Sequence, residues 1–200
     1  MPTKNFDIAQ KITTETCPKR RLQVDSIRLF AGIIERKAYS KGDIILPEGR
    51  VCHAMMYVEK GLVRQYYFKH DKEMTEHISC EQGVVICIDS YFNQRPTQLI
   101  VEALEDTVIW EIPYVAMEKL ASEVHDISYL YRHFLQNSLI LSQVKADMLR
   151  FESAKDRYTK LMQHSPEIVR RAPLTYIASY LQMTLETLSR ARASIVASEY

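Results

Sequence analysis

Five side chains near the end of the chain have types and spacing suited to binding a polyanion. Glu186 and Arg190 are four residues apart, so they share one face if the segment is helical. A carboxylate can accept a hydrogen bond from cytosine N4, and an arginine can donate two to guanine O6 and N7. Thr187 and Ser189 are short donors suited to phosphate or base contacts, while Arg192, offset around the helix, is expected to meet phosphate. The Glu186–Arg190 spacing is equally common in solvent-exposed salt bridges, so taken alone it leaves both interpretations open.

The residues around this group predict two short helices joined by a turn at residues 182–184. Thr184 is suited to cap the second helix, because its hydroxyl can accept from a free backbone N–H of the first turn. Ala178 is small and allows the two helices to cross closely. Apolar residues fall on one face of each helix: Leu174, Ile177, Ala178 and Leu181 in the first, and Leu188, Ala191 and Ile195 in the second. This is the helix-turn-helix pattern, whose second helix lies in the DNA major groove.

A longer helical stretch precedes this pair. Between Pro113 and about Arg150 the chain has no glycine or proline, and apolar residues recur at helical spacing. They are Met117, Leu120, Val124, Ile127, Tyr131, Phe134, Leu141 and Met148. Ser138 and Lys145 occupy the two positions at which the stripe turns polar. Such a stripe must be buried, on its own domain or against a second copy of the chain. The helix looks too long for the small domain beside it, which favours a dimer.

The first half of the chain has a different character. Its glycines separate short segments rich in Val, Ile and Tyr, which recur about every 8–12 residues with turn signals between them. The segments are DIILPEG, AMMYVEKG, LVRQYYFK, EMTEHISC, GVVICI, QLIVEAL and TVIWEI. They predict an antiparallel sandwich or barrel built by residues 38–112.

With these elements in order, the chain resembles the Crp/Fnr transcription regulators. Glu186-x-x-Ser189-Arg190 is similar to the E-x-x-S-R element of their recognition helices, and YIASYLQMTLETLSRARASI is especially like members that carry IASYLGMTPETLSR. The resemblance covers roughly residues 25–196. It implies an α+β fold: an N-terminal antiparallel β-roll (a cupin-like jelly roll), a long dimerisation helix and a C-terminal winged-helix-like helix-turn-helix domain. The expected boundaries are a helical extension over 1–24, the cyclic-nucleotide-binding-like β-roll over 25–124, the dimerisation helix over 125–150 and the DNA-binding domain over 151–200.

The resemblance also implies how these parts would work together. In that family the β-roll binds an effector, the long helix dimerises, and the paired helix-turn-helix units grip a palindromic operator in double-stranded DNA. Two-fold symmetry would place the recognition helices about 34 Å apart, one turn of DNA. The long helix would begin near Asp126, with residues 117–124 forming a separate short helix. RNA polymerase is a further candidate partner, and an unidentified small molecule is the candidate effector.

The effector region departs from the members that bind cyclic AMP. Those members carry a G-E step and a later R-S/T-A, whose glutamate and arginine hold the ribose and the cyclic phosphate. Here Cys87-Ile88 stands at the first position and Thr97-Gln98-Leu99 at the second. A buried phosphate without a paired cation is costly, and Arg95 precedes Pro96 in an expected turn, so we expect no cyclic AMP binding. The candidate pocket residues are Ile88, Asp89, Arg95, Thr97 and Gln98.

Two departures lie at the DNA end. Gln182 stands where relatives often have glycine and Leu185 where many have proline, so the joint is expected to hold a non-glycine residue at positive φ. The sequence ends shortly after the recognition helix, so no β-hairpin wing is expected on that side and fewer phosphate contacts would follow.

Composition narrows the remaining classes of function. Net charge is only +1, but residues 150–200 hold eight Lys/Arg against five Asp/Glu, a modestly basic end that permits nucleic-acid binding. The mixture of residues is ordinary for a globular protein, and neither a signal peptide nor an apolar run of about 20 residues is present, so a soluble cytoplasmic protein without membrane contact is expected.

Cofactors and catalysis find no support in the sequence. The cysteines at 17, 52, 80 and 87 form no CxxC pair, which favours reduced thiols over a metal site or a disulfide framework, with a redox sensor as the alternative. An iron–sulfur cluster would need a tight N-terminal cysteine group, and Cys17 stands alone there. The histidines at 53, 70, 77, 125, 133 and 164 form no HxH or HxxxH set, so no metal is expected. No nucleophile, P-loop or dinucleotide motif appears, and the chain is not expected to be an enzyme.

Two other hypotheses stay open at this point. One is a small-molecule-sensing β-roll that acts through protein partners and keeps a vestigial DNA-binding domain. The other is a metal-dependent cupin enzyme.

Overall fold

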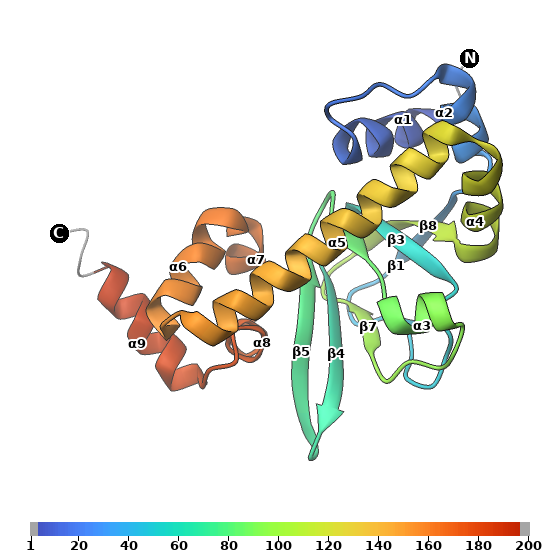
Figure 1. The fold of residues 1–200 in the computed structure, drawn as a ribbon. Coiled ribbons are helices and arrows are strands. Elements are labelled where there is room, and N and C mark those ends of the chain that lie inside the picture. Colours follow the sequence, from blue (N-terminus) through green and yellow to red (C-terminus); the bar gives the residue numbers. More distant parts are fainter. Residues whose placement is uncertain (1–3, 197–200) are drawn as a thin grey trace.

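The computed structural model describes residues 4–196. Figure 1 shows a β-roll with helices packed on one side, a helical C-terminal part, and one long helix that connects them. The α+β class and the order of elements expected from the sequence are confirmed.

The β-roll consists of two four-stranded antiparallel sheets, ordered β1-β8-β3-β6 and β2-β7-β4-β5. The strands are β1 (Glu35–Tyr39), β2 (Ile44–Leu46), β3 (Ala54–Lys60), β4 (Val63–Lys69), β5 (Lys72–Ser79), β6 (Val84–Val85), β7 (Ile100–Ala103) and β8 (Thr107–Pro113). Six of them follow the segments expected from the sequence closely. The expected strand at 83–88 is cut short to β6, and the short helix α3 (Ile88–Asn93) takes its second half.

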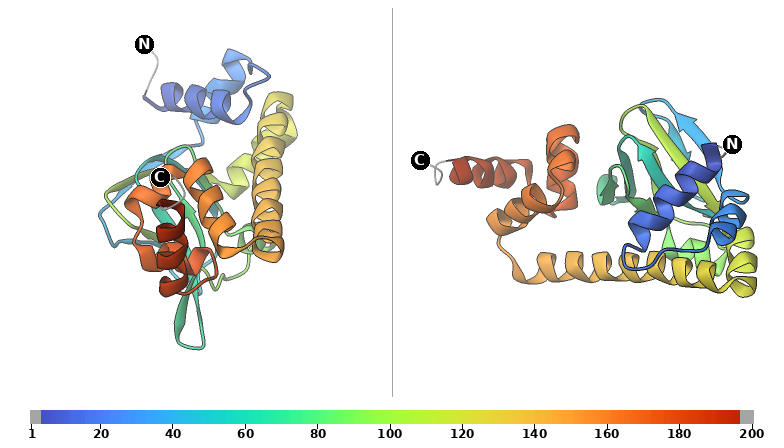
Figure 2. Two further views of the ribbon diagram at one scale, coloured as in Figure 1. Left: turned by 90° about the vertical axis from the view of Figure 1, so that its left-hand side faces the viewer. Right: turned by 90° about the horizontal axis from the view of Figure 1, so that it is seen from above.

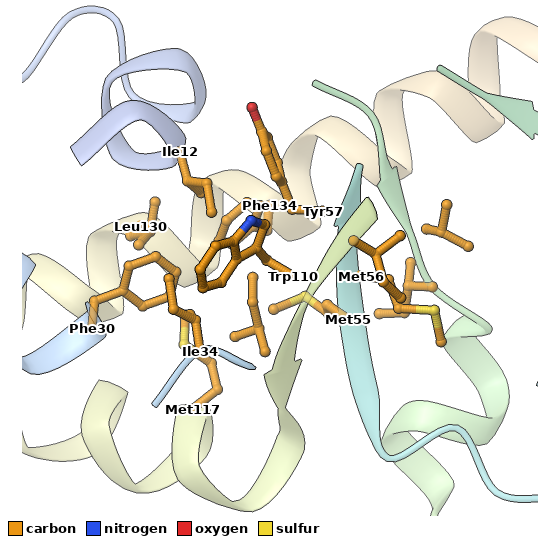
Figure 3. Close-up of a cluster of buried hydrophobic side chains, with 14 of the residues drawn as sticks. Ile12, Phe30, Ile34, Met55, Met56, Tyr57, Trp110, Met117, Leu130 and Phe134 are labelled. Carbon is orange, nitrogen blue, oxygen red and sulfur yellow. The ribbon is translucent and has the colours of Figure 1, made fainter. Parts of the chain in front are cut away.

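Four helices pack on the sheet β1-β8-β3-β6: α1 (Lys4–Thr16), α2 (Val24–Ala31), α4 (Tyr114–Glu123) and the first half of α5 (His125–Phe151). Their apolar faces meet around the fully buried Trp110, as Figure 3 shows, with Phe30, Leu130 and Phe134 beside it. The N-terminal helices are also tied down by polar contacts, because buried Asp126 accepts from Arg20 Nη2 (2.7 Å) and from the backbone N–H of Gln23 (2.8 Å).

Helix α5 is the longest element, with 27 residues and thus a length of about 40 Å. Val124 has extended backbone (φ −123°) and separates α4 from α5, so the break expected near residue 125 is confirmed. The first half of α5 is buried on the β-roll, whereas its middle exposes the large apolar side chains of Leu139, Ile140, Leu141 and Val144. Figure 2 shows the helix running from the β-roll to the C-terminal helices.

The C-terminal part contains α6 (Ala154–His164), α7 (Pro166–Arg171), α8 (Leu174–Tyr180) and α9 (Leu185–Val196). Their apolar faces form a second core, which also includes Leu62 and Ile78 of the β-roll. The helical part is therefore docked on the β4–β5 hairpin.

Candidate nucleic-acid interface and effector cavity

Helices α8 and α9 are joined by a tight turn that the sequence specifies residue by residue. Gln182 has φ +51°, so the positive φ expected at this joint is confirmed. The backbone N–H of Met183 donates to the Ala178 carbonyl (3.0 Å), which closes the turn. Thr184 caps α9, because its Oγ1 accepts from the backbone N–H of Thr187 (3.1 Å). The turn thereby fixes the direction in which α9 leaves α8.

The inner face of α9 is anchored by packing. Leu188 and Ala191 are buried, and Leu188 belongs to the second core together with Leu181 and Ala178 of the preceding helix and turn. Helix α6 packs against α9 as well, and Arg157 Nη1 of α6 donates to the Leu181 carbonyl (2.5 Å). With its inner face fixed in this way, α9 can present only one side to solvent.

The exposed side of α9 carries the predicted base-reading residues. Glu186 and Arg190 lie side by side, with Arg190 Nη2 3.8 Å from Glu186 Oε1, and their side chains are 80% and 71% exposed. An ion pair with this distance and exposure contributes little to the stability of the fold, so both side chains remain available to a ligand. Ser189 and Arg192 are exposed on the same helix, whereas Thr187 is half-buried and its hydroxyl bonds to Thr184 Oγ1 (2.9 Å). The structure therefore places four of the five predicted contacts in solvent and ties the fifth to the helix cap.

A cavity of about 520 Å³ lies between the β-roll, the middle of α5 and the turn of the helix-turn-helix. The β-roll contributes Gln65, Glu76, His77, Val84, Ile86, Ile88, Asp89 and Leu99; α5 contributes Ser138, Leu141, Ser142, Lys145, Ala146 and Leu149; the turn contributes Gln182. This volume is in the range of small-molecule sites. Most of the lining is apolar, and three parts of the chain meet in it.

The five predicted effector-pocket residues are only partly brought together. Ile88 and Asp89 line the cavity. Arg95 is exposed and forms an ion pair with Asp89 (2.7 Å). Thr97 is buried, and its hydroxyl accepts from the backbone N–H of Leu99 (3.0 Å), while Gln98 is exposed. None of the last three is among the lining residues of the cavity that the structure describes.

Three titratable residues of the cavity, Glu76, His77 and Lys145, were not among the predicted site residues. Lys145 Nζ lies 2.7 Å from Glu76 Oε1 and also donates to the Glu76 carbonyl. Burial, and secondarily the charge of Lys145, lowers the pKa of His77 to about 4, so His77 is neutral at pH 7. A signal for this site existed in the sequence, because Ser138 and Lys145 interrupt the apolar stripe of the long helix at the two positions that line the cavity.

Metal ligands, cysteines and long apolar helices are the remaining features of the described residues that could have functional meaning. Within residues 4–196, no group of three or more His, Cys, Asp or Glu side chains is arranged to hold a metal ion. The four cysteines form no disulfide, and Cys17, Cys52 and Cys87 are buried. None of the described helices has the length and apolarity required to cross a bilayer.

The described chain thus combines a jelly-roll domain, one long helix and a helix-turn-helix unit. Comparison with known proteins finds one matching domain model and two similar regulators. Residues 36–123 match the model of the cyclic nucleotide-binding domain. The chain is 23% identical over 189 residues to Regulatory protein HlyX of Actinobacillus pleuropneumoniae, covering 88% of this chain and 78% of that protein. It is also 23% identical over 189 residues to Electron transport regulator A of Shewanella oneidensis, covering 87% and 74%.

Among solved structures, FixK2 from Bradyrhizobium japonicum superposes with a TM-score of 0.67 at 21% identity, covering 84% of this chain and 86% of that one. The domain match, the two regulators and the shared fold agree with one another. These matches all point to a regulator of the Crp/Fnr family.

Proposed function

We propose that the chain is a homodimeric, sequence-specific DNA-binding transcription regulator that recognises a palindromic operator. Glu186, Ser189 and Arg190 would read base edges, while Thr187 and Arg192 would support them with phosphate contacts. The observation that carries this proposal is the two-sided construction of α9: an inner face locked by Leu188 and Ala191, and an outer face on which Glu186 and Arg190 stand exposed.

The dimer would form along α5. The exposed apolar side chains of Leu139, Ile140, Leu141 and Val144 follow one another within two turns of this helix. An apolar patch on a long helix is costly to leave in water, and a second copy of the same helix can cover it with two-fold symmetry. Such a dimer presents two recognition helices, as a palindromic site with half-sites one DNA turn apart requires.

The β-roll would respond to a small molecule other than cyclic AMP. Within the described residues, the cavity lining includes one lysine and no arginine, and that lysine is already paired with Glu76. Arg95, the other candidate cation, forms its ion pair with Asp89. An added cyclic phosphate would therefore lack a free cation, and its burial would be costly. The regulator would act in the cytoplasm, and RNA polymerase would be its partner at the promoter.

Binding-site selection from random duplex DNA tests the proposal. Purified protein is expected to enrich a palindrome whose half-sites are one helical turn apart, and binding should weaken as salt is raised. Selection is repeated in the presence of a small-molecule extract, because an effector could be required. Failure to enrich any palindrome under both conditions would contradict DNA recognition and favour a β-roll sensor that acts through protein partners.

A further inference from the structure

Arg64 is a buried cation at the junction of the β-roll and the helix-turn-helix. It lies on β4, and its side chain is only 1% exposed. The guanidinium donates to Thr75 Oγ1 (3.0 Å) and to Glu73 (2.8 Å), and it lies 3.4 Å from Glu102. A buried charge is tolerated when its hydrogen bonds and charge are satisfied, and strands β5 and β7 supply these partners here.

Two aromatic rings cover the faces of the same guanidinium. The guanidinium carbon of Arg64 lies 4.2 Å from the ring centroid of Tyr66 and 3.6 Å from that of Tyr176. Tyr66 belongs to the β-roll, but Tyr176 belongs to α8. Docking of α8 therefore completes the burial of Arg64, and without α8 one guanidinium face would lose its cover. A desolvated arginine stacked on an aromatic ring is a favourable contact, so this pair draws α8 towards the sheet.

The same face of α8 makes two further contacts with β5. Ser179 Oγ accepts from the backbone N–H of Thr75 (2.8 Å), and the ring of Tyr180 lies edge-on to His77, with centroids 6.1 Å apart. Residues 176, 179 and 180 are three and four positions apart, so they share one side of the helix. The contact is therefore a face of α8 and not an accidental touch of one side chain.

This docking leaves the outer face of α9 exposed to solvent. Helix α9 packs against α6 and α8, and its outer side chains, including Glu186 and Arg190, are exposed. In Figure 1, α9 lies on the far side of α8 and α6 from the β-roll. The docked arrangement is therefore compatible with DNA contact. It determines the position of α9 relative to the rest of the protomer.

A second anchor holds α7 independently of Arg64. Arg171 bridges Glu81 (2.7 Å) and Glu105 (2.5 Å) of the β-roll. Burial would raise the pKa of Glu81, but hydrogen bonds from Arg171 and from the Gly61 amide outweigh it and lower the pKa to about 2. If the contact at Tyr176 were loosened, α8 and α9 could shift while Arg171 keeps α7 attached to the β-roll.

We propose that Arg64 is a positioning residue: by stacking on Tyr176 it fixes α8 on the β4–β5 hairpin and thereby sets the half-site spacing that the dimer accepts. The proposal rests on the dimeric DNA-binding function proposed above. In a two-fold dimer, a fixed relation between α9 and the body of each protomer fixes the separation of the two recognition helices. The affinity of one recognition helix for one half-site does not depend on that relation.

The test compares Tyr176→Leu, which removes the ring, with Tyr176→Phe, which keeps it and serves as the matched control. Each protein is titrated with the selected palindrome, with versions whose spacer is longer or shorter by one base pair, and with a single half-site. Tyr176→Leu is expected to lose about tenfold in affinity for the best spacing, the size of one good cation–ring contact, and to bind all three spacings almost equally. Half-site affinity should stay as in the wild type, and Tyr176→Phe should keep the spacing preference.

Amide hydrogen exchange without DNA provides a readout that does not depend on the proposed function. The Thr75 amide and the amides of α8 should exchange faster in Tyr176→Leu but not in Tyr176→Phe, while the helices packed around Trp110 stay protected. Unchanged exchange would overturn the role of Arg64 and Tyr176 in docking. Faster exchange with an intact spacing preference would reduce Arg64 to a structural contact and overturn the proposal. If the wild type binds no duplex, the proposed function fails, and the exchange data still decide whether the stack docks α8.

Discussion

Lys145 of α5 and Glu76 of β5 form an ion pair, with Nζ and Oε1 2.7 Å apart, at the wall of the cavity beneath the long helix. The lysine side chain is 13% exposed, so its charge is turned towards the protein. The pair ties α5 to β5 and occupies the lysine that could otherwise pair with an anionic effector.

Cyclic AMP is therefore expected not to bind the wild-type protein. Isothermal titration should show no saturable heat, because the described lining of the cavity offers no unpaired cation to offset the desolvation of the phosphate. Glu76→Gln frees Lys145 and is expected to allow weak, salt-sensitive binding, whereas Glu48→Gln, an exposed change away from the cavity, should not. Saturable binding to the wild type would contradict this prediction.

Arg190→Ala is expected to weaken operator binding by roughly 1–3 kcal/mol and to relax the preference at one base pair of each half-site. The reason is the loss of a two-pronged hydrogen bond to guanine. Arg192→Ala is the matched comparison, expected to weaken binding to all sequences alike and to lower the salt dependence. Quantitative titrations with a set of single-base operator variants separate the two patterns. If Arg190→Ala lowers affinity uniformly, Arg190 contacts phosphate.

Ile140→Glu is expected to break the dimer into monomers, since it places a charge in the middle of the apolar patch on α5. Light scattering coupled to size-exclusion chromatography measures the mass directly. Val115→Glu is the control: Val115 is an exposed apolar residue on α4, outside the patch, and its replacement should leave the mass unchanged. A wild-type protein that is monomeric at micromolar concentration, with and without DNA, would exclude pairing through α5.

His77 makes stability depend on pH. Its pKa is lowered in the folded protein to about 4, first by burial and then by Lys145, whereas in the unfolded chain it is near 6.5. Between these values the unfolded chain binds more protons than the folded one, so the free energy of unfolding should fall as pH decreases from about 6.5 towards 4. His77→Gln should flatten this part of the profile, and His164→Gln, an exposed change, should not. Urea unfolding at several pH values measures it, and identical profiles for both variants would refute the assignment.

Much of the fold was predictable because its signals are local. Strands such as Val63–Lys69 and Thr107–Pro113 are rich in β-branched and aromatic residues, and the helices after Pro113 follow apolar periodicity. Strand β1 was missed, since Glu35–Tyr39 is mostly charged and exposed and has no alternation to detect. It is a strand because it pairs with β8, from Glu35–Glu111 to Tyr39–Thr107, and that partner lies more than 60 residues away.

The candidate sites also differ in whether they depend on local signals or on contacts between distant segments. The exposed face of α9 and its Thr184 cap could be located because spacing within one helix and one turn determines them. Arg64 gave no such signal. In the segment VRQYYF it resembles an ordinary surface arginine of a strand, and its burial depends on Tyr176, which is far along the chain. The cavity likewise depends on three distant segments meeting, and only the polar gap in the α5 stripe hinted at it.

The shared core beneath α8 also has a consequence for protein engineering. Leu62 and Ile78 belong to the β-roll in sequence but are buried among the helices of the C-terminal part. A chimera that exchanges residues 151–196 for the corresponding part of another regulator would leave these two side chains, and one face of Arg64, against a foreign surface. The boundary of the transplantable unit therefore does not coincide with the end of α5, and a working graft must carry the inward-facing residues of the β4–β5 hairpin with it.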